Sequence, residues 1–170
     1  MVKGLTKPSS PLQISFQAVE AGANTFAQAA IDLQLNVLDQ EVFVVTGVDI
    51  DLLPPDAVAG VDTRMRGSVS TTSRTTIGDL ADSNVIASAR DDIRAAGFVD
   101  SGVGFASSYG ESPAVGMSYL AIIATNDFFC QVEGNGNVGA KGLSGKLYGY
   151  RAVADANTFS ALVQSELLSA

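Results

Sequence analysis

Three aspartates in the first third of the chain carry side chains that could bind a hard cation. Asp49 and Asp51 are two residues apart and would share one face of a β-strand, and Asp32 could join them. Carboxylate oxygens are the ligands that Ca²⁺ prefers, but the spacing of an EF-hand loop is absent. A polar strand face, against solvent or a subunit interface, explains the same residues without an ion. We therefore predict no metal site, and cation binding near Asp49 and Asp51 stays an alternative.

A glycine-rich segment has the spacing of a dinucleotide-binding motif. Gly134, Gly136 and Gly139 spell G-x-G-x-x-G after an apolar run. That motif needs a helix to begin there, with its N-terminus facing a pyrophosphate. Gly142 and Gly145 continue the glycine run, and each opposes a helix by about 1 kcal/mol. We therefore expect a loop between strands and no cofactor.

Residues 98–102 read Phe-Val-Asp-Ser-Gly and resemble the active-site strand of the aspartic proteases. In the retroviral-type members of that family, one such Asp per chain meets its twin in a homodimer. Two carboxylates that share a proton could activate water, which would give this role to Asp100. The later apolar-apolar-Gly element of the family is missing, because Ile122 and Ile123 are followed by Ala124. The protease remains an alternative, and we predict that the protein is not an enzyme.

The composition excludes several other functions. The 170 residues include no His and a single Cys, Cys130, so His-based catalysis and Cys-rich zinc sites are impossible. Only 16% of the residues are charged, whereas about 25% is typical. A soluble chain with so few charges is expected to cover part of its neutral surface with other copies of itself.

The charges are unevenly distributed. Residues 8–63 hold eight acids and no base, and residues 64–94 hold five arginines. Complementary patches of this kind let identical copies dock. Arg64, Arg66 and Arg74 could alternatively contact nucleic acid phosphates, but the net charge of −8 argues against a strong nucleic-acid binder.

Alternation of apolar and polar residues predicts several β-strands. It begins at Leu12, and its clearest unit is a hairpin of residues 31–37 and 42–50 around a loop at Asp39-Gln40. In that register Leu35 pairs with Val44 and Ile31 with Val48. Further strands are predicted at 63–72, 99–107 and 143–153, and a second hairpin joins 118–125 to 128–133.

Two helices are expected between or after these strands. Asp82 or Ser83 could cap a helix over residues 83–96, which Gly97 would end. A second amphipathic helix is predicted at the C-terminus, residues 156–168.

Together these elements predict a mainly β protein, an antiparallel, jelly-roll-like β-sandwich with about eight strands, one inserted helix and a C-terminal helix. Residues 1–11, with two prolines and two lysines, are expected to form a flexible N-terminal arm, and residues 12–170 a single domain. No apolar run indicates a signal peptide or a membrane span.

A compact β protein with an arm, long neutral strands and few charges resembles the jelly-roll coat proteins of small icosahedral viruses. The resemblance covers most of residues 12–154 at the level of strand number. It implies a structural capsid protein that self-assembles as a homo-oligomeric shell around a genome. The protein would be made in the host cytoplasm and located in the virion, where other virion proteins could be partners.

A non-viral β-sandwich module that binds carbohydrate or protein is the other alternative. Tyr148 and Tyr150 share a strand face and would form its aromatic platform. Packing in the core or at an interface is the interpretation we favour for both tyrosines.

Overall fold

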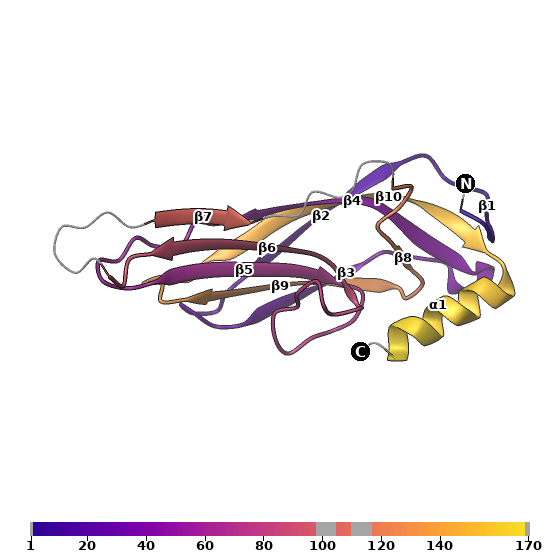
Figure 1. Cartoon of the computed structure of the whole chain (residues 1–170). Helices are drawn as coiled ribbons and strands as arrows, with labels where there is room; N and C mark the ends of the chain where they lie inside the picture. Colours follow the sequence, from indigo (N-terminus) through magenta and orange to yellow (C-terminus); the bar gives the residue numbers. More distant parts are fainter. Residues whose placement is uncertain (1, 98–104, 110–116, 169–170) are drawn as a thin grey trace.

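Ten strands and one α-helix follow one another along the residues that this computed structural model describes, 2–97, 105–109 and 117–168 (Figure 1). The first half of the chain contains β1 (Leu5–Thr6), β2 (Leu12–Val19), β3 (Ala27–Asp32), the 3-10 turn η1 (Val37–Asp39), β4 (Glu41–Leu52), β5 (Thr63–Ser70) and β6 (Val85–Arg94). The second half contains β7 (Phe105–Tyr109), β8 (Ala121–Ile123), β9 (Asp127–Asn135), β10 (Gly142–Ala154) and α1 (Ala156–Leu168).

The strands form two antiparallel sheets packed face to face, as in a β-sandwich (Figure 1). The first sheet has the order β1-β10-β4-β8, and β2 pairs with the same side of β10 as β1. The second sheet has the order β3-β9-β5-β6-β7. The prediction of a mainly β sandwich with a C-terminal helix is confirmed, although the described residues contain ten strands and no inserted helix.

The main core lies between the two sheets. Alternate residues of each strand point inward, and Phe43, Met65 and Phe128 have no exposed surface. Phe16 meets Phe128 edge to face, with ring centroids 5.7 Å apart. Gly145 leaves room for the Phe16 ring, since a Cβ there would come within 2.4 Å of it.

A second apolar cluster lies on the outer face of the first sheet, beneath α1. Phe159, Leu162 and Val163 of the helix pack against the outward side chains of Val42 and Val44. The inward side chains of the same stretch of β4 lie in the main core. Strand β4 is thus buried on both faces at this end of the sandwich.

The helix itself begins where the sequence predicts. The Asp155 carboxylate accepts a hydrogen bond from the Thr158 N–H at 2.8 Å, which is an N-cap contact. This bond lowers the pKa of Asp155 below its ordinary value, and the Thr158 side chain adds to the effect. The prediction of a helix at 156–168 is confirmed.

The helix predicted at 83–96 is wrong. Residues Val85–Arg94 form strand β6, which pairs with β5 from Thr63 to Ser70. Ala87 and Ala89 face inward on this strand, and alanine is a strong helix former. Pairing with β5 outweighs the local helical preference, because strand formation depends on packing against neighbours more than on intrinsic propensity.

Both predicted hairpins are wrong, because their strands lie in different sheets. Strand β3 pairs with β9, whereas β4 pairs with β10 and β8, so Leu35 does not pair with Val44, nor Ile31 with Val48. Strands β8 and β9 are likewise in different sheets. Alternation identifies the buried face of a strand but leaves its partner open.

Part of the predicted N-terminal arm is paired with the first sheet. Leu5 and Thr6 pair with β10, Leu5 is buried, and the Ser9 N–H donates to the Arg151 carbonyl at 2.8 Å. The strand predicted at 99–107 corresponds to β7 only from residue 105, because residues 98–104 lie outside the described part of the chain.

Candidate functional site

The outer face of the second sheet carries two of the three arginines that the sequence singles out, Arg64 and Arg66. Register places Arg64, Arg66, Ser68 and Ser70 of β5 on one face, as predicted. Arg64 binds Asp92 of β6 at 2.6 Å, and Arg66 binds Glu133 of β9 at 3.2 Å. Opposite charges from neighbouring strands therefore neutralise much of this basic patch.

Asp92 is the central carboxylate among these ion pairs on the outer face of the second sheet. It is only 4% exposed and also accepts from Arg90 at 2.9 Å, so two guanidinium groups bind one buried carboxylate. A buried carboxylate is stable only when it is paired and hydrogen-bonded. Any phosphate that bound Arg64 would have to compete with Asp92.

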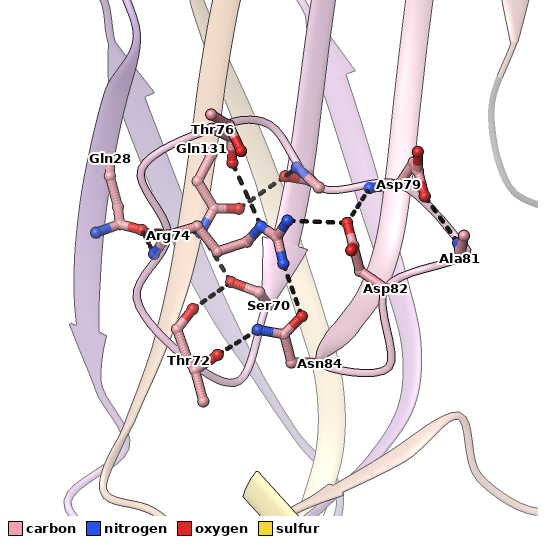
Figure 2. Close-up of polar contacts among 12 residues, drawn as sticks. Gln28, Ser70, Thr72, Arg74, Thr76, Asp79, Ala81, Asp82, Asn84 and Gln131 are labelled. Carbon is pink, nitrogen blue, oxygen red and sulfur yellow. Dashed lines mark hydrogen bonds and ion pairs between the residues drawn. The ribbon is translucent and has the colours of Figure 1, made fainter. Parts of the chain in front are cut away.

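The third candidate, Arg74, lies in the segment 71–84 that connects β5 to β6 and folds back over the second sheet (Figure 2). Its guanidinium donates to the Asn84 amide oxygen at 2.8 Å, to the Asp82 carboxylate at 2.9 Å and to the Thr76 carbonyl at 3.3 Å. Its backbone N–H donates to Gln28 of β3 at 2.8 Å. Arg74 therefore links different parts of the connection to one another and joins the connection to the sheet. Its guanidinium donors are used within the chain and do not point outward toward a phosphate.

Beneath this connection lies a buried network of amides and hydroxyls (Figure 2). Gln131 of β9 accepts from Ser68 at 2.7 Å and donates to Ser70 at 2.8 Å and to Gln28 at 3.0 Å. The Gly78 N–H donates to Ser68 at 3.1 Å. In the described part of the chain, the partners of these two serines are amide and carbonyl groups, so the network fixes the connection in place.

The glycine-rich loop binds carboxylates of its own chain. The Glu20 side chain accepts from the Gly134 N–H at 2.7 Å and the Lys141 N–H at 2.9 Å. Asp56 accepts from the Val138 N–H at 3.0 Å and from the Lys141 ammonium at 2.5 Å. The loop leads into β10 and not into a helix, so the expected connection between strands is confirmed. The backbone N–H groups of this loop thus bind the carboxylates of Glu20 and Asp56.

The same contacts perturb Asp56. The hydrogen bond from the Lys141 side chain is the main cause that lowers the pKa of Asp56, and the backbone N–H of Val138 adds to it. Asp56 is therefore ionised at neutral pH, and it anchors the loop that joins β9 to β10.

The structure keeps two of the three candidate cation ligands, Asp49 and Asp51, on one strand face and separates Asp32 from them. Asp49 and Asp51 point outward from β4 in the first sheet, beside Lys146 and Ser15, around a shallow depression. Asp32 ends β3 in the second sheet and accepts from the Gln34 N–H at 2.7 Å and from Asn126 at 2.9 Å. Within the described part of the chain, no cluster of three or more potential ligands could hold a metal ion.

The remaining candidates are Asp100 and the two tyrosines, Tyr148 and Tyr150. Asp100 is outside the described residues. The Tyr148 hydroxyl donates to Asp49 at 3.1 Å, which raises the pKa of the phenol, whereas Tyr150 packs against the cluster under α1. The two tyrosines therefore form no common platform, and Tyr148 alone is available to a ligand.

Sequence reasoning missed two buried glutamates that anchor loops. Glu20 holds the glycine-rich loop through the Gly134 and Lys141 N–H groups. Glu166 of α1 is 7% exposed and accepts from the Ala124 N–H at 2.7 Å and the Thr125 N–H at 3.1 Å. The sequence could have revealed Glu166, because this glutamate falls on the apolar face of the predicted amphipathic helix, next to Leu162 and Val163.

No protein-family model matches the chain, and no curated protein matches it. None of the helices in the described ranges is both long and apolar enough to span a membrane.

Proposed function

We propose that this protein is a structural protein that assembles with copies of itself, and more specifically a viral capsid protein whose copies form the shell around a genome. The observation that carries the proposal is the nesting of strand pairs. Leaving aside β1 and β7, the first strand pairs with the last (β2 with β10), the second with the seventh (β3 with β9), the third with the sixth (β4 with β8) and the fourth with the fifth (β5 with β6).

This nesting is what results when a long antiparallel ribbon of eight strands rolls up into two sheets. The rolled ribbon brings β10 beside β4 and β9 beside β5, which completes the two sheets. This nesting supports a jelly roll, an eight-strand double sheet that viral capsid domains share with lectins and cupins. Histidine is the commonest metal ligand in proteins, and this chain has none.

Exposed apolar side chains at both ends of the sandwich support a function in subunit contacts. Leu38 in η1 is 94% exposed, and Leu168 at the end of α1 is 87% exposed. Val138, in the loop between β9 and β10 at the other end, is 78% exposed. In a chain with so few charges, such residues are suited to contacts with neighbouring copies.

The proposal is tested by the mass and shape of the purified protein, from light scattering and negative-stain microscopy of the same fraction. We expect uniform megadalton particles, formed by the protein alone or after single-stranded nucleic acid is added. The Leu38→Glu variant should form fewer particles and keep its fold, since this side chain is almost fully exposed. A protein that stays monomeric or dimeric in both conditions would overturn the capsid function.

A binding module is the second candidate, and the surroundings of Tyr148 favour it. This partly exposed ring lies on the same outer face of the first sheet as Lys146 and Asp49, which could give a sugar both a stacking surface and hydrogen bonds. In that case the protein would be a small oligomer that binds a carbohydrate. Binding would be lost in the Tyr148→Ala variant and kept in Tyr150→Ala.

A further inference from the structure

The open edge of the first sheet is formed by β2, which is eight residues long. Among the described residues, β2 pairs with β10 and with no strand on its other side. The opposite edge of the same sheet, β8, is only three residues long. A long open edge presents unpaired backbone groups to any strand that approaches it.

The phase of the β2–β10 ladder shows which backbone groups of β2 point outward. Just beyond β2, the Glu20 N–H donates to the Lys141 carbonyl at 2.9 Å, so this opposed pair is hydrogen-bonded. Hydrogen-bonded and non-hydrogen-bonded pairs alternate along an antiparallel ladder. The backbone N–H and C=O groups of the even-numbered residues of β2 therefore point toward β10. The backbone groups that point away from β10 belong to Gln13, Ser15, Gln17 and Val19.

A second hydrogen bond supports this phase. Gly142 lies opposite Val19, and its carbonyl accepts from the Leu53 N–H at 3.0 Å. Leu53 directly follows β4 on the other side of β10. The Gly142 carbonyl thus points away from β2, as a non-hydrogen-bonded pair requires.

The side chains of β2 do not protect this edge. Its sequence, LQISFQAV, contains no charge, proline or glycine. Proteins that keep an edge unpaired usually place a lysine, a proline or a bulge there. The side chains of Gln13, Ser15 and Gln17 are exposed, and Leu12 and Ile14 on the core side are only half-buried.

We propose that β2 pairs with β2 of a second copy of this chain, antiparallel and about a two-fold axis, so that two first sheets join into one continuous sheet. The inference rests on the proposed self-assembly and assigns one of its contacts.

Self-complementarity favours a second copy over a strand of another protein. A two-fold axis through Ser15 pairs residues 12–18 with residues 18–12 of the second copy, whereas an axis through Gln17 pairs only 15–19. In the Ser15 register, the side chain of Gln13 in one copy lies opposite the side chain of Gln17 in the other copy. The two side-chain amides can then hydrogen-bond to each other. On the core side Ile14 lies opposite Phe16, which extends the apolar face. Self-pairing brings no like charges together, because β2 has none.

Cross-linking tests this register directly. Two Ser15 residues opposed across the axis would have Cα atoms about 5.5 Å apart, within disulfide range. The matched control is Ser144→Cys on β10, an exposed serine opposite Gln17 on the same face. Two copies of that residue would be at least ~14 Å apart, three strand spacings. Cys130, the native thiol, is fully buried and should not react.

We expect mild oxidation to convert most Ser15→Cys protein into a covalent dimer and to leave Ser144→Cys at least tenfold less cross-linked. A second comparison uses charge: Gln17→Lys should weaken association at least tenfold, and Ser144→Lys, which adds the same charge one strand further in, should not. Hydrogen exchange of the Ser15 and Gln17 amides should slow as association proceeds.

The outcomes separate this contact from the proposed function. Particles that form normally from Gln17→Lys, with no Ser15→Cys dimer, would overturn the edge pairing and leave the capsid function in place. A cross-linked dimer that never forms particles would support the pairing and overturn the capsid function. A monomer without cross-links would overturn both. Ser15 and Gln17 amides already protected in a monomer would show an edge covered within the chain, which also overturns the pairing.

Discussion

The carboxylate of Glu166 is predicted to hold the C-terminal helix on the sandwich, and its removal can be given a magnitude. Both carboxylate oxygens accept backbone N–H groups, Ala124 at 2.7 Å and Thr125 at 3.1 Å, from a side chain that is 7% exposed. Hydrogen bonds to a charged group contribute about 1.5–3 kcal/mol each. Because the helix can shift and admit water, we expect Glu166→Ala to lower the free energy of unfolding by about 3 kcal/mol, the lower end of that sum.

Two further variants define the cause. Glu166→Gln keeps one acceptor oxygen but places an NH₂ donor near the other N–H, so a loss of about 1.5 kcal/mol is expected. Gln164→Ala is the matched control on an exposed face of the same helix, and its effect should stay within about 0.5 kcal/mol.

The assay is chemical denaturation followed by far-ultraviolet circular dichroism, combined with amide hydrogen exchange. In Glu166→Ala the Ala124 and Thr125 amides should exchange about 100-fold faster, as a loss of ~3 kcal/mol implies. If that variant loses less than about 1 kcal/mol and these amides exchange as in the wild type, the carboxylate does not anchor the helix.

Four other outcomes are expected. Gly145→Ala should lower the free energy of unfolding by more than about 2 kcal/mol, because the added Cβ would lie 2.3 Å from the Asp49 carbonyl oxygen. Gly139→Ala, which has open space around it, should leave the free energy of unfolding unchanged, and equal losses in the two variants would contradict this packing. Arg74→Ala should make the segment 71–84 the first site of limited proteolysis, and an unchanged cleavage pattern would refute its role. The pKa of Asp56 is lowered on folding, chiefly by Lys141, so its stabilisation is present above the ordinary value of 3.8 and is lost as the pH falls through the lower folded pKa. Asp56→Asn should therefore flatten the loss of stability below about pH 4, and an unchanged slope would exclude this contribution. Burial raises the pKa of Cys130 to about 11, so a thiol reagent at pH 8 should react only after unfolding, and rapid reaction with the native protein would contradict the burial.

Much of the candidate site was predictable only as separate residues. Alternation places Arg64 and Arg66 on one face of a strand, and the register confirms this. Their partners, Asp92 and Glu133, come from strands 28 and 67 residues further along the chain, and nothing local connects them. Gln131 was visible as a polar residue within the apolar run FFCQV, but its burial depends on a connection that folds back from β5.

The errors have a common physical origin. A strand pattern fixes which side chains are buried, and the buried face can be satisfied by any partner of compatible shape. Segments 31–37 and 42–50 carry matching patterns and a turn between them, yet the turn carries the chain from one sheet to the other. Asn126 supports this crossing, since its side chain accepts from the Leu35 N–H at 2.7 Å.

Side-chain periodicity and the backbone preferences of a few neighbouring residues were enough to predict a strand from Leu12, strands at 63–72 and 143–153, the C-terminal helix and the loop at the glycines. The structure has each of these elements, with strands at 12–19, 63–70 and 142–154. The tertiary structure alone decided that Val85–Arg94 is a strand, which strands pair, and which charges meet. Those outcomes depend on contacts between residues far apart in the chain, whose energies exceed the local preferences that a sequence pattern records.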